Sequence, residues 1–100
     1  MTIRHVVAWK LTAADDTERA ADAARIAREL NALQGVVPEL ISITAGAECV
    51  FPGENFDVAV VADVADAEAL ARYKSHPAHI AAGAFIGSVT AERVAVDFTL

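Results

Sequence analysis

Four segments of the chain alternate hydrophobic residues with polar or small ones at a period of two. This period predicts β-strands over residues 3–11, 40–47, 56–64 and 92–98. In the first strand His5, Val7 and Trp9 share one face, while Val6 and Ala8 share the other. The third strand repeats the pattern, with Phe56, Val58, Val60, Ala62 and Val64 together on one face.

The second strand is predicted to alternate without interruption. Leu40, Ser42 and Thr44 would then lie on one face, and Ile41, Ile43 and Ala45 on the other. Pro52-Gly53, between the second and third strands, is a turn signal.

Two other segments carry a helical period. After the acidic run that begins at Asp15, apolar residues recur at helical spacing through Ala23, Ile26, Ala27, Leu30 and Leu33. Gly35 is the predicted stop. Asp66 is expected to cap a short helix that runs through Lys74. The chain then breaks at His76-Pro77 and continues as a helix to about Val89, because proline is favoured at the first helical position.

The order of these elements is βαββαβ, which predicts an α+β fold. We expect one domain over residues 1–100, a ferredoxin-like plait with a four-stranded antiparallel sheet and both helices on one face. The other face would then expose a hydrophobic patch, which a monomer rarely leaves in water. The expected residues of this patch are Val6, Ala8, Ala59, Val61, Val94, Val96 and Phe98. We therefore expect a homodimer that packs sheet against sheet.

Charge and composition narrow the set of partners. The net charge is −6 and no basic run exceeds two residues, so neither nucleic acid nor an anionic membrane surface is an expected partner. No apolar run approaches the roughly 20 residues that span a bilayer. One cysteine, Cys49, excludes an internal disulfide, and a cytoplasmic location is the default expectation. Cys49 is interpreted as a small half-buried residue rather than a nucleophile.

The candidate chemistry is concentrated in residues 73–79. Two of the three histidines, His76 and His79, and the single tyrosine, Tyr73, lie there, whereas His5 is on the first strand. His79 falls in the first turn of a predicted helix, where the helix dipole disfavours imidazolium and lowers the histidine pKa. A neutral imidazole near pH 7 can act as a general base. His76 is expected just outside the helix start, in solvent or near the dimer edge.

Four segments together resemble the stress-responsive dimeric α/β-barrel (Dabb) family. They are Ile3 to Leu11, Phe56 to Asp63, Tyr73 to His79 with its His-Pro-Ala-His core, and Val94 to Phe98. The resemblance implies a homodimer of plaits and a pocket between each sheet and its own helices. In cyclase-type members of the family, the tyrosine before the His-Pro-x-His motif and the last histidine of that motif carry the chemistry. The resemblance therefore implies catalytic roles for Tyr73 and His79 in this chain, with His5 lining the same cavity. We expect Val7, Trp9 and Val60 to line it as well.

Several functions remain open at this level. One is a cofactor-free cyclase or lyase that acts on a hydrophobic carbonyl compound, with His79 as base and Tyr73 as hydrogen-bond donor. Another is a non-catalytic dimer that binds a small apolar ligand or serves stress tolerance, and a third, weaker one is a cofactor-free monooxygenase. No cofactor is expected. A zinc site built from the three histidines is disfavoured, because His76 and His79 straddle a helix start. Arg93 is expected either to bind an anion or to pair with a surface acid.

Overall fold

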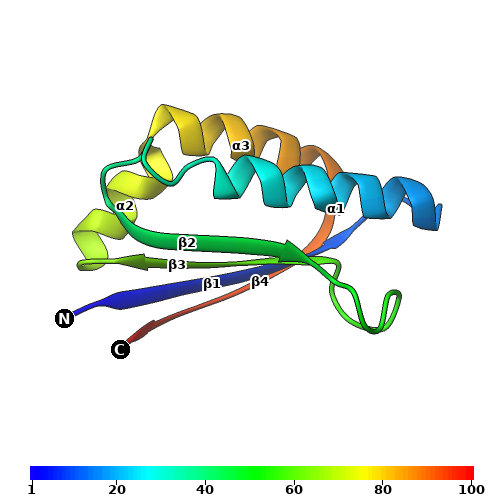
Figure 1. The fold of residues 1–100 in the computed structure, drawn as a ribbon, viewed down its shortest axis with the longest axis horizontal. Coiled ribbons are helices and arrows are strands. Elements are labelled where there is room, and N and C mark those ends of the chain that lie inside the picture. Colours follow the sequence, from blue (N-terminus) through cyan, green and yellow to red (C-terminus); the bar gives the residue numbers. More distant parts are fainter.

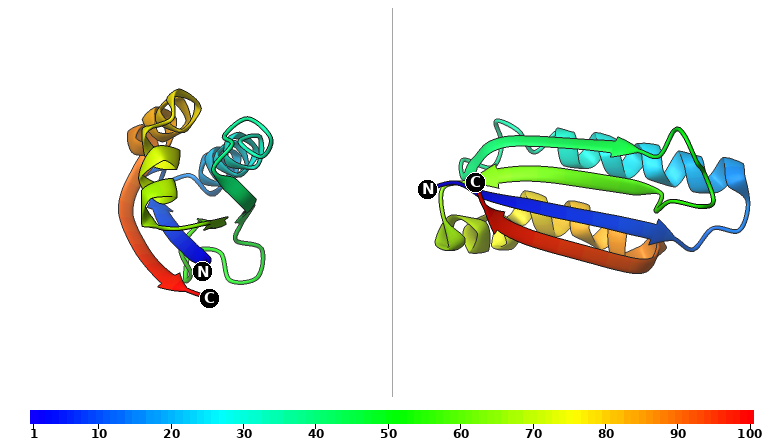
Figure 2. Two further views of the ribbon diagram at one scale, coloured as in Figure 1. Left: turned by 90° about the vertical axis from the view of Figure 1, so that its left-hand side faces the viewer. Right: turned by 90° about the horizontal axis from the view of Figure 1, so that it is seen from below.

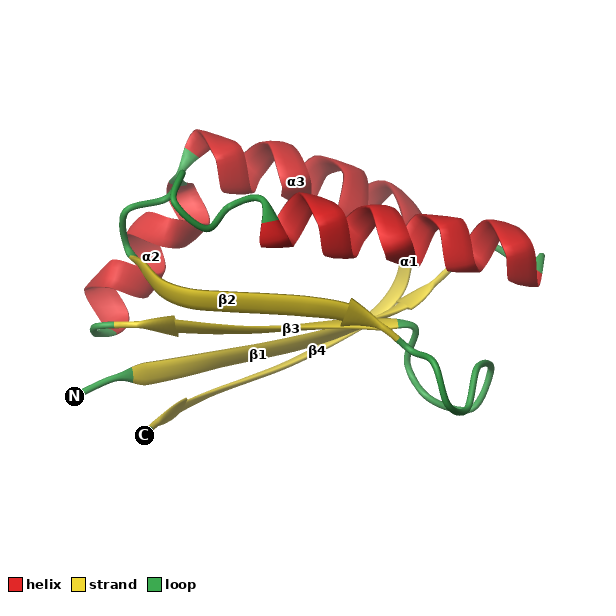
Figure 3. Cartoon of the chain, in the orientation of Figure 1, coloured by secondary structure: helices red, strands yellow, loops and turns green.

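The computed structural model describes residues 1–100 as a sheet with helices on one side. In chain order the elements are β1 (Ile3–Leu11), α1 (Asp16–Asn31), β2 (Leu40–Ala47), β3 (Val58–Val64), α2 (Ala67–Ser75), α3 (Pro77–Val89) and β4 (Thr90–Thr99). The four strands are antiparallel in the order β2-β3-β1-β4. Figures 1 and 3 show α1 and α3 above the sheet and nothing below it except the β2–β3 loop. The predicted ferredoxin-like plait is confirmed.

Local side chains explain where the helices begin. The Asp15 carboxylate accepts hydrogen bonds from the backbone N–H groups of Thr17 and Glu18, and Asp66 accepts one from Ala69. These bonds pair N–H groups that have no partner inside the helix. The predicted stop at Gly35 is too late for α1. The helix ends at Asn31, and Gly35 instead adopts a φ of 82° in the turn that follows.

The strand bounds and one face assignment differ from the sequence prediction. Strand β3 begins at Val58 rather than Phe56, and β4 begins at Thr90 rather than Glu92. The uninterrupted alternation predicted for β2 is wrong. A shift in the β2–β3 register between Leu40 and Ser42 places Leu40 in the core together with Ile43 and Ala45. Such a bulge adds one residue to a strand and exchanges the faces of the residues beyond it.

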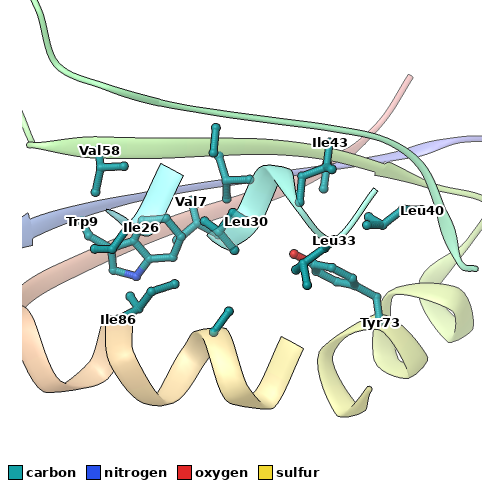
Figure 4. Close-up of a cluster of buried hydrophobic side chains, with 14 of the residues drawn as sticks. Val7, Trp9, Ile26, Leu30, Leu33, Leu40, Ile43, Val58, Tyr73 and Ile86 are labelled. Atoms are coloured by element: carbon teal, nitrogen blue, oxygen red, sulfur yellow. The ribbon is translucent and has the colours of Figure 1, made fainter. Parts of the chain in front are cut away.

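The core fills the space between the helices and the inner face of the sheet. Val7 and Trp9 of β1 pack there against Ile26 and Leu30 of α1, as Figure 4 shows. The prediction that His5, Val7 and Trp9 face the helices is therefore confirmed, since all three are buried. No helix has the length and apolar character needed to cross a membrane.

The outer face of the sheet carries the predicted hydrophobic patch. Val94, Val96 and Phe98 of β4 are 53%, 62% and 44% exposed, and Val61 of β3 is 37% exposed. We call this surface the open face; it comprises Val6, Ala8, Ala59, Val61, Val94, Val96 and Phe98. The loop of residues 48–57 bends to the same side of the sheet (Figure 2).

Candidate functional site

A cavity of about 210 Å³ lies between the inner face of the sheet and helices α2 and α3. It is small beside the roughly 300–1,000 Å³ of typical ligand pockets, so it suits a small molecule. Its walls combine hydrophobic side chains with a few polar groups. The lining residues are His5, Val7, Trp9, Leu30, Val60, Tyr73, Lys74, His79, Gly83, Ile86, Gly87, Thr90 and Arg93.

The cavity brings together His5, Tyr73 and His79 from three different elements. The ring centroids of Tyr73 and His79 are 4.6 Å apart, and those of His5 and Tyr73 are 6.2 Å apart, both in edge-on arrangements. Val7, Trp9 and Val60, the other expected lining residues, also border the cavity. The six residues expected at the cavity therefore all border it.

Tyr73 reaches inward from α2 and is only 1% exposed (Figure 4). Every fully enclosed polar side-chain atom of the protein has a hydrogen-bond partner, yet the Tyr73 hydroxyl bonds to no protein group. Its hydroxyl therefore has access to the cavity. Burial raises the pKa of Tyr73 to about 12, so the phenol keeps its proton and remains a hydrogen-bond donor.

The backbone fixes the tautomer of His79. Its Nδ1 lies 3.1 Å from the carbonyl oxygen of Lys74. A carbonyl can only accept, so Nδ1 carries the hydrogen and donates it, which leaves Nε2 as the basic nitrogen. Burial is the main cause that lowers the pKa of His79. The hydrogen bond to the Lys74 carbonyl opposes this shift, and the nearby cations Lys74 and Arg93 add to it. The direction agrees with the sequence prediction, but burial rather than the helix dipole is the main cause.

His5 has a partner that the sequence did not indicate. Its Nδ1 lies 2.5 Å from a carboxylate oxygen of Asp97, the residue directly opposite on β4. A carboxylate oxygen accepts, so His5 Nδ1 donates to Asp97 and the other ring nitrogen, Nε2, is turned away from this bond. The ring is 3% exposed, and no protein group contacts Nε2 by a hydrogen bond. Asp97 thus sets the orientation of the His5 ring that borders the cavity.

The other candidate residues lie elsewhere or play different parts. His76 is just outside α3, as expected, but its ring is not simply in solvent: Nδ1 accepts a hydrogen bond from Ala78 N–H and caps the helix. Cys49 is exposed rather than half-buried. Arg93 forms no ion pair with a surface acid and instead borders the cavity. No group of three or more His, Cys, Asp or Glu side chains is arranged to hold a metal ion.

A second, larger cavity of about 360 Å³ lies beside the start of α1 and the β2–β3 loop. Its charged groups are already engaged within the protein. Arg19 pairs with Asp16 and Asp57, and Asp57 also accepts a hydrogen bond from the Leu11 backbone N–H. The Glu48 carboxylate accepts three hydrogen bonds, from Val50, Phe51 and Asn55, which lower its pKa to about 2. These contacts hold the loop in place, so we assign this cavity a structural role.

Sequence reasoning did not identify Lys74, Gly83, Gly87 or Asp97 as parts of the site. A signal for the glycines is present, because His79, Gly83 and Gly87 follow one another at a spacing of four and share a helix face. Asp97 shares a strand face with Arg93, on the side away from Val96. The alternation of residues along β4 predicts that Asp97 and Arg93 share a face. The pairing of Asp97 with His5, however, depends on the register between β1 and β4.

The βαββαβ order and the one-sided helices define a ferredoxin-like α+β protein, with a cavity between its helices and its sheet. The sequence profile of the stress responsive A/B barrel domain (Dabb) matches residues 3–100, and the chain belongs to this family. No curated protein matches this sequence.

Solved structures share the fold over almost the whole chain. A dimeric ferredoxin-like protein of unknown function from Thermobifida fusca is 33% identical, with a TM-score of 0.83 over 100% of this chain and 92% of that one. A dimeric protein of unknown function from Bacteroides fragilis is 23% identical, with a TM-score of 0.89 over 99% and 96%. A hydroxynitrile lyase from Passiflora edulis is 13% identical, with a TM-score of 0.77 over 99% and 93%.

Proposed function

We propose that this protein is a cofactor-free enzyme that removes a proton from a small, mainly hydrophobic carbonyl compound, in a cyclase- or lyase-type reaction. The observation that carries the proposal is the facing pair in the cavity, with the Tyr73 and His79 rings 4.6 Å apart. His79 offers an unprotonated Nε2, and Tyr73 offers a hydroxyl with no protein partner. The two rings touch edge-on and both border the cavity, so a reacting group in the cavity can lie near the base and the donor together.

In the proposed reaction His79 Nε2 takes an acidic proton next to the substrate carbonyl. Charge then develops on the carbonyl oxygen, and the Tyr73 hydroxyl donates a hydrogen bond to it. The low pKa of His79 keeps the base unprotonated at neutral pH, and the high pKa of Tyr73 keeps the donor protonated. His5, oriented by Asp97, adds a second imidazole to the cavity wall that can position the substrate. That a Passiflora lyase has the same fold is consistent with this chemistry.

We further propose that the functional unit is a homodimer that buries the open face. Val94, Val96 and Phe98 leave too much apolar surface in water for a stable monomer, and related structures from two bacteria are described as dimeric. Near this surface the Arg4 guanidinium and the Asp63 carboxylate form a two-bond ion pair, with both distances 2.9 Å.

Proton removal can be tested as a single step, separately from any bond that forms or breaks afterwards. Exchange of α-hydrogens for deuterium, followed by proton NMR in D₂O, would be measured for a panel of aromatic ketones and β-keto compounds. His79→Ala should slow exchange by about 10²–10⁴-fold, the usual contribution of a general base. Tyr73→Phe should slow it by about 10²–10³-fold, as for loss of one oxyanion donor.

A neighbouring histidine provides the matched control. His76→Asn removes an imidazole outside the cavity but keeps a residue that caps helices well, so exchange should remain at the wild-type rate. Full activity in both His79→Ala and Tyr73→Phe would refute the assignment. If no carbonyl compound exchanges but the panel still binds, the alternative of a non-catalytic ligand-binding dimer is preferred, because the apolar walls of the cavity suit that role equally.

A further inference from the structure

The charge of the cavity differs from that of the protein as a whole. The chain carries a net charge of −6, with 14 acidic residues against 8 lysines and arginines. Among the residues that line the cavity, however, Lys74 and Arg93 are cationic and none is Asp or Glu. The cavity is therefore a locally positive site on an acidic molecule.

These two cations are also among the few without an acidic partner. Five of the 8 lysines and arginines form ion pairs: Arg4 with Asp63, Lys10 with Glu92, Arg19 with Asp16 and Asp57, Arg25 with Glu29, and Arg72 with Glu39. The three that remain are Arg28, Lys74 and Arg93. Two of these three, Lys74 and Arg93, border the same cavity. Their positive charges are therefore not neutralised by an acidic side chain and remain available to a ligand.

From this arrangement we infer that the ligand of the cavity carries a carboxylate group, and that Arg93 binds it, assisted by Lys74. The inference rests on the proposed function and narrows its substrate to a small carboxylate that also bears an acidic C–H. Arg93 lies opposite Trp9 in the β1–β4 register, beyond the part of β1 that holds His5. A ligand along β1 can thus place its anionic end at Arg93 and its reactive end at Tyr73 and His79.

The chemistry of the site favours a carboxylate over a phosphate. A single guanidinium matches a planar carboxylate with two parallel N–H bonds. A phosphate site would typically add backbone N–H groups from a helix start. The nearby start of α3 lacks a free group of that kind at Ala78, because the His76 side chain accepts its N–H. The positive charges of Lys74 and Arg93 also lower the pKa of His79, so both cations are close enough to interact electrostatically with the proposed base.

Trp9 provides a direct readout, since it is the only tryptophan and borders the cavity. Its fluorescence would be titrated with benzoate and with benzamide, a neutral compound of the same shape. Wild-type protein should bind benzoate about tenfold or more tightly, the contribution of a charge-assisted hydrogen-bonded pair. Added salt should reduce that preference, and Arg93→Gln should abolish it by weakening the binding of benzoate far more than that of benzamide.

Arg28→Gln is the matched control, because Arg28 is an exposed, unpaired arginine on α1 outside the cavity. It should retain the full preference for benzoate, and Arg93→Lys should retain part of it. Equal binding of the two compounds by wild type, no saturable change with either, or an equal loss in Arg28→Gln and Arg93→Gln would overturn the inference. Failure of the proposed catalysis is a separate result: benzoate preference would persist while α-hydrogen exchange is absent.

Discussion

At the scale of single residues, burial beside the cavity favours opposite protonation states in two neighbouring side chains. Tyr73 stays protonated because burial penalises phenolate, and His79 stays neutral because burial penalises imidazolium. The backbone carbonyl of Lys74 then directs the proton of the neutral ring to Nδ1. One desolvated environment thus prepares a donor and an acceptor together.

The lowered pKa of His79 makes a prediction about pH dependence. Activity should fall on the acid side only below about pH 6.5, the ordinary histidine pKa, and Tyr73 should cause no alkaline loss until its pKa of about 12 is approached. A pH profile of α-hydrogen exchange checks both limbs. A half-maximal rate well above pH 6.5 on the acid side would contradict the assignment of His79 as the base.

The same shift affects stability, and its sign follows from proton linkage. The folded state resists protonation of His79, so below pH 6.5 the unfolded chain binds more protons than the folded one. The free energy of unfolding should therefore decrease as pH falls from 6.5 towards the lower folded-state pKa. Urea unfolding across this range would measure the slope, and His79→Ala should reduce it.

At the scale of elements, helix α3 carries two glycines on the side that borders the cavity. Gly83 and Gly87 border the cavity, and a Cβ atom built at either position meets no atom within 4 Å. Glycine destabilises a helix interior by roughly 0.5–1 kcal/mol relative to alanine. Because sterics do not require glycine at these positions, we attribute it to the space that it leaves for a ligand.

Substitution of Gly83 should separate stability from ligand binding. Gly83→Ala should raise the free energy of unfolding by about 0.5–1 kcal/mol, measured in urea, because helix propensity improves without a clash. The added methyl group occupies cavity space, so benzoate binding should weaken, and Gly83→Leu should weaken it more. A destabilised Gly83→Ala protein would show that the glycine serves backbone geometry instead.

Much of the element pattern could be predicted from the sequence, but part of the site could not. Alternation placed His5, Val7 and Trp9 on the inner face, and the break at Pro77 separated α2 from α3. The contact between His5 and Asp97 depends on a register between the first and last strands, which local patterns do not encode. The shift at Leu40 likewise arises from the β2–β3 pairing rather than from the strand itself.

At the scale of the whole molecule, the proposed oligomeric state depends on the open face. Val96→Glu should place an unpaired charge in the proposed dimer interface, at a cost on the order of several kcal/mol. Light scattering at micromolar concentration should then report monomer or aggregate. Ala24→Glu, which adds the same charge on an exposed part of α1, should leave the dimer intact. A wild-type mass of one chain would refute the proposed dimer.

Strands β1 and β4 belong to the cavity and to the open face at once, through alternate residues. His5 and Trp9 point inward while Val6 and Ala8 lie on the other side, and Arg93 and Asp97 are interleaved with Val94, Val96 and Phe98. In the proposed dimer, self-association and ligand binding are then coupled equilibria. If dimerisation changes the affinity for a ligand by some factor, binding of that ligand must change the dimerisation constant by the same factor. Where dimerisation tightens ligand binding, dilution would release the small molecule, and saturation with it would stabilise the dimer by the same factor.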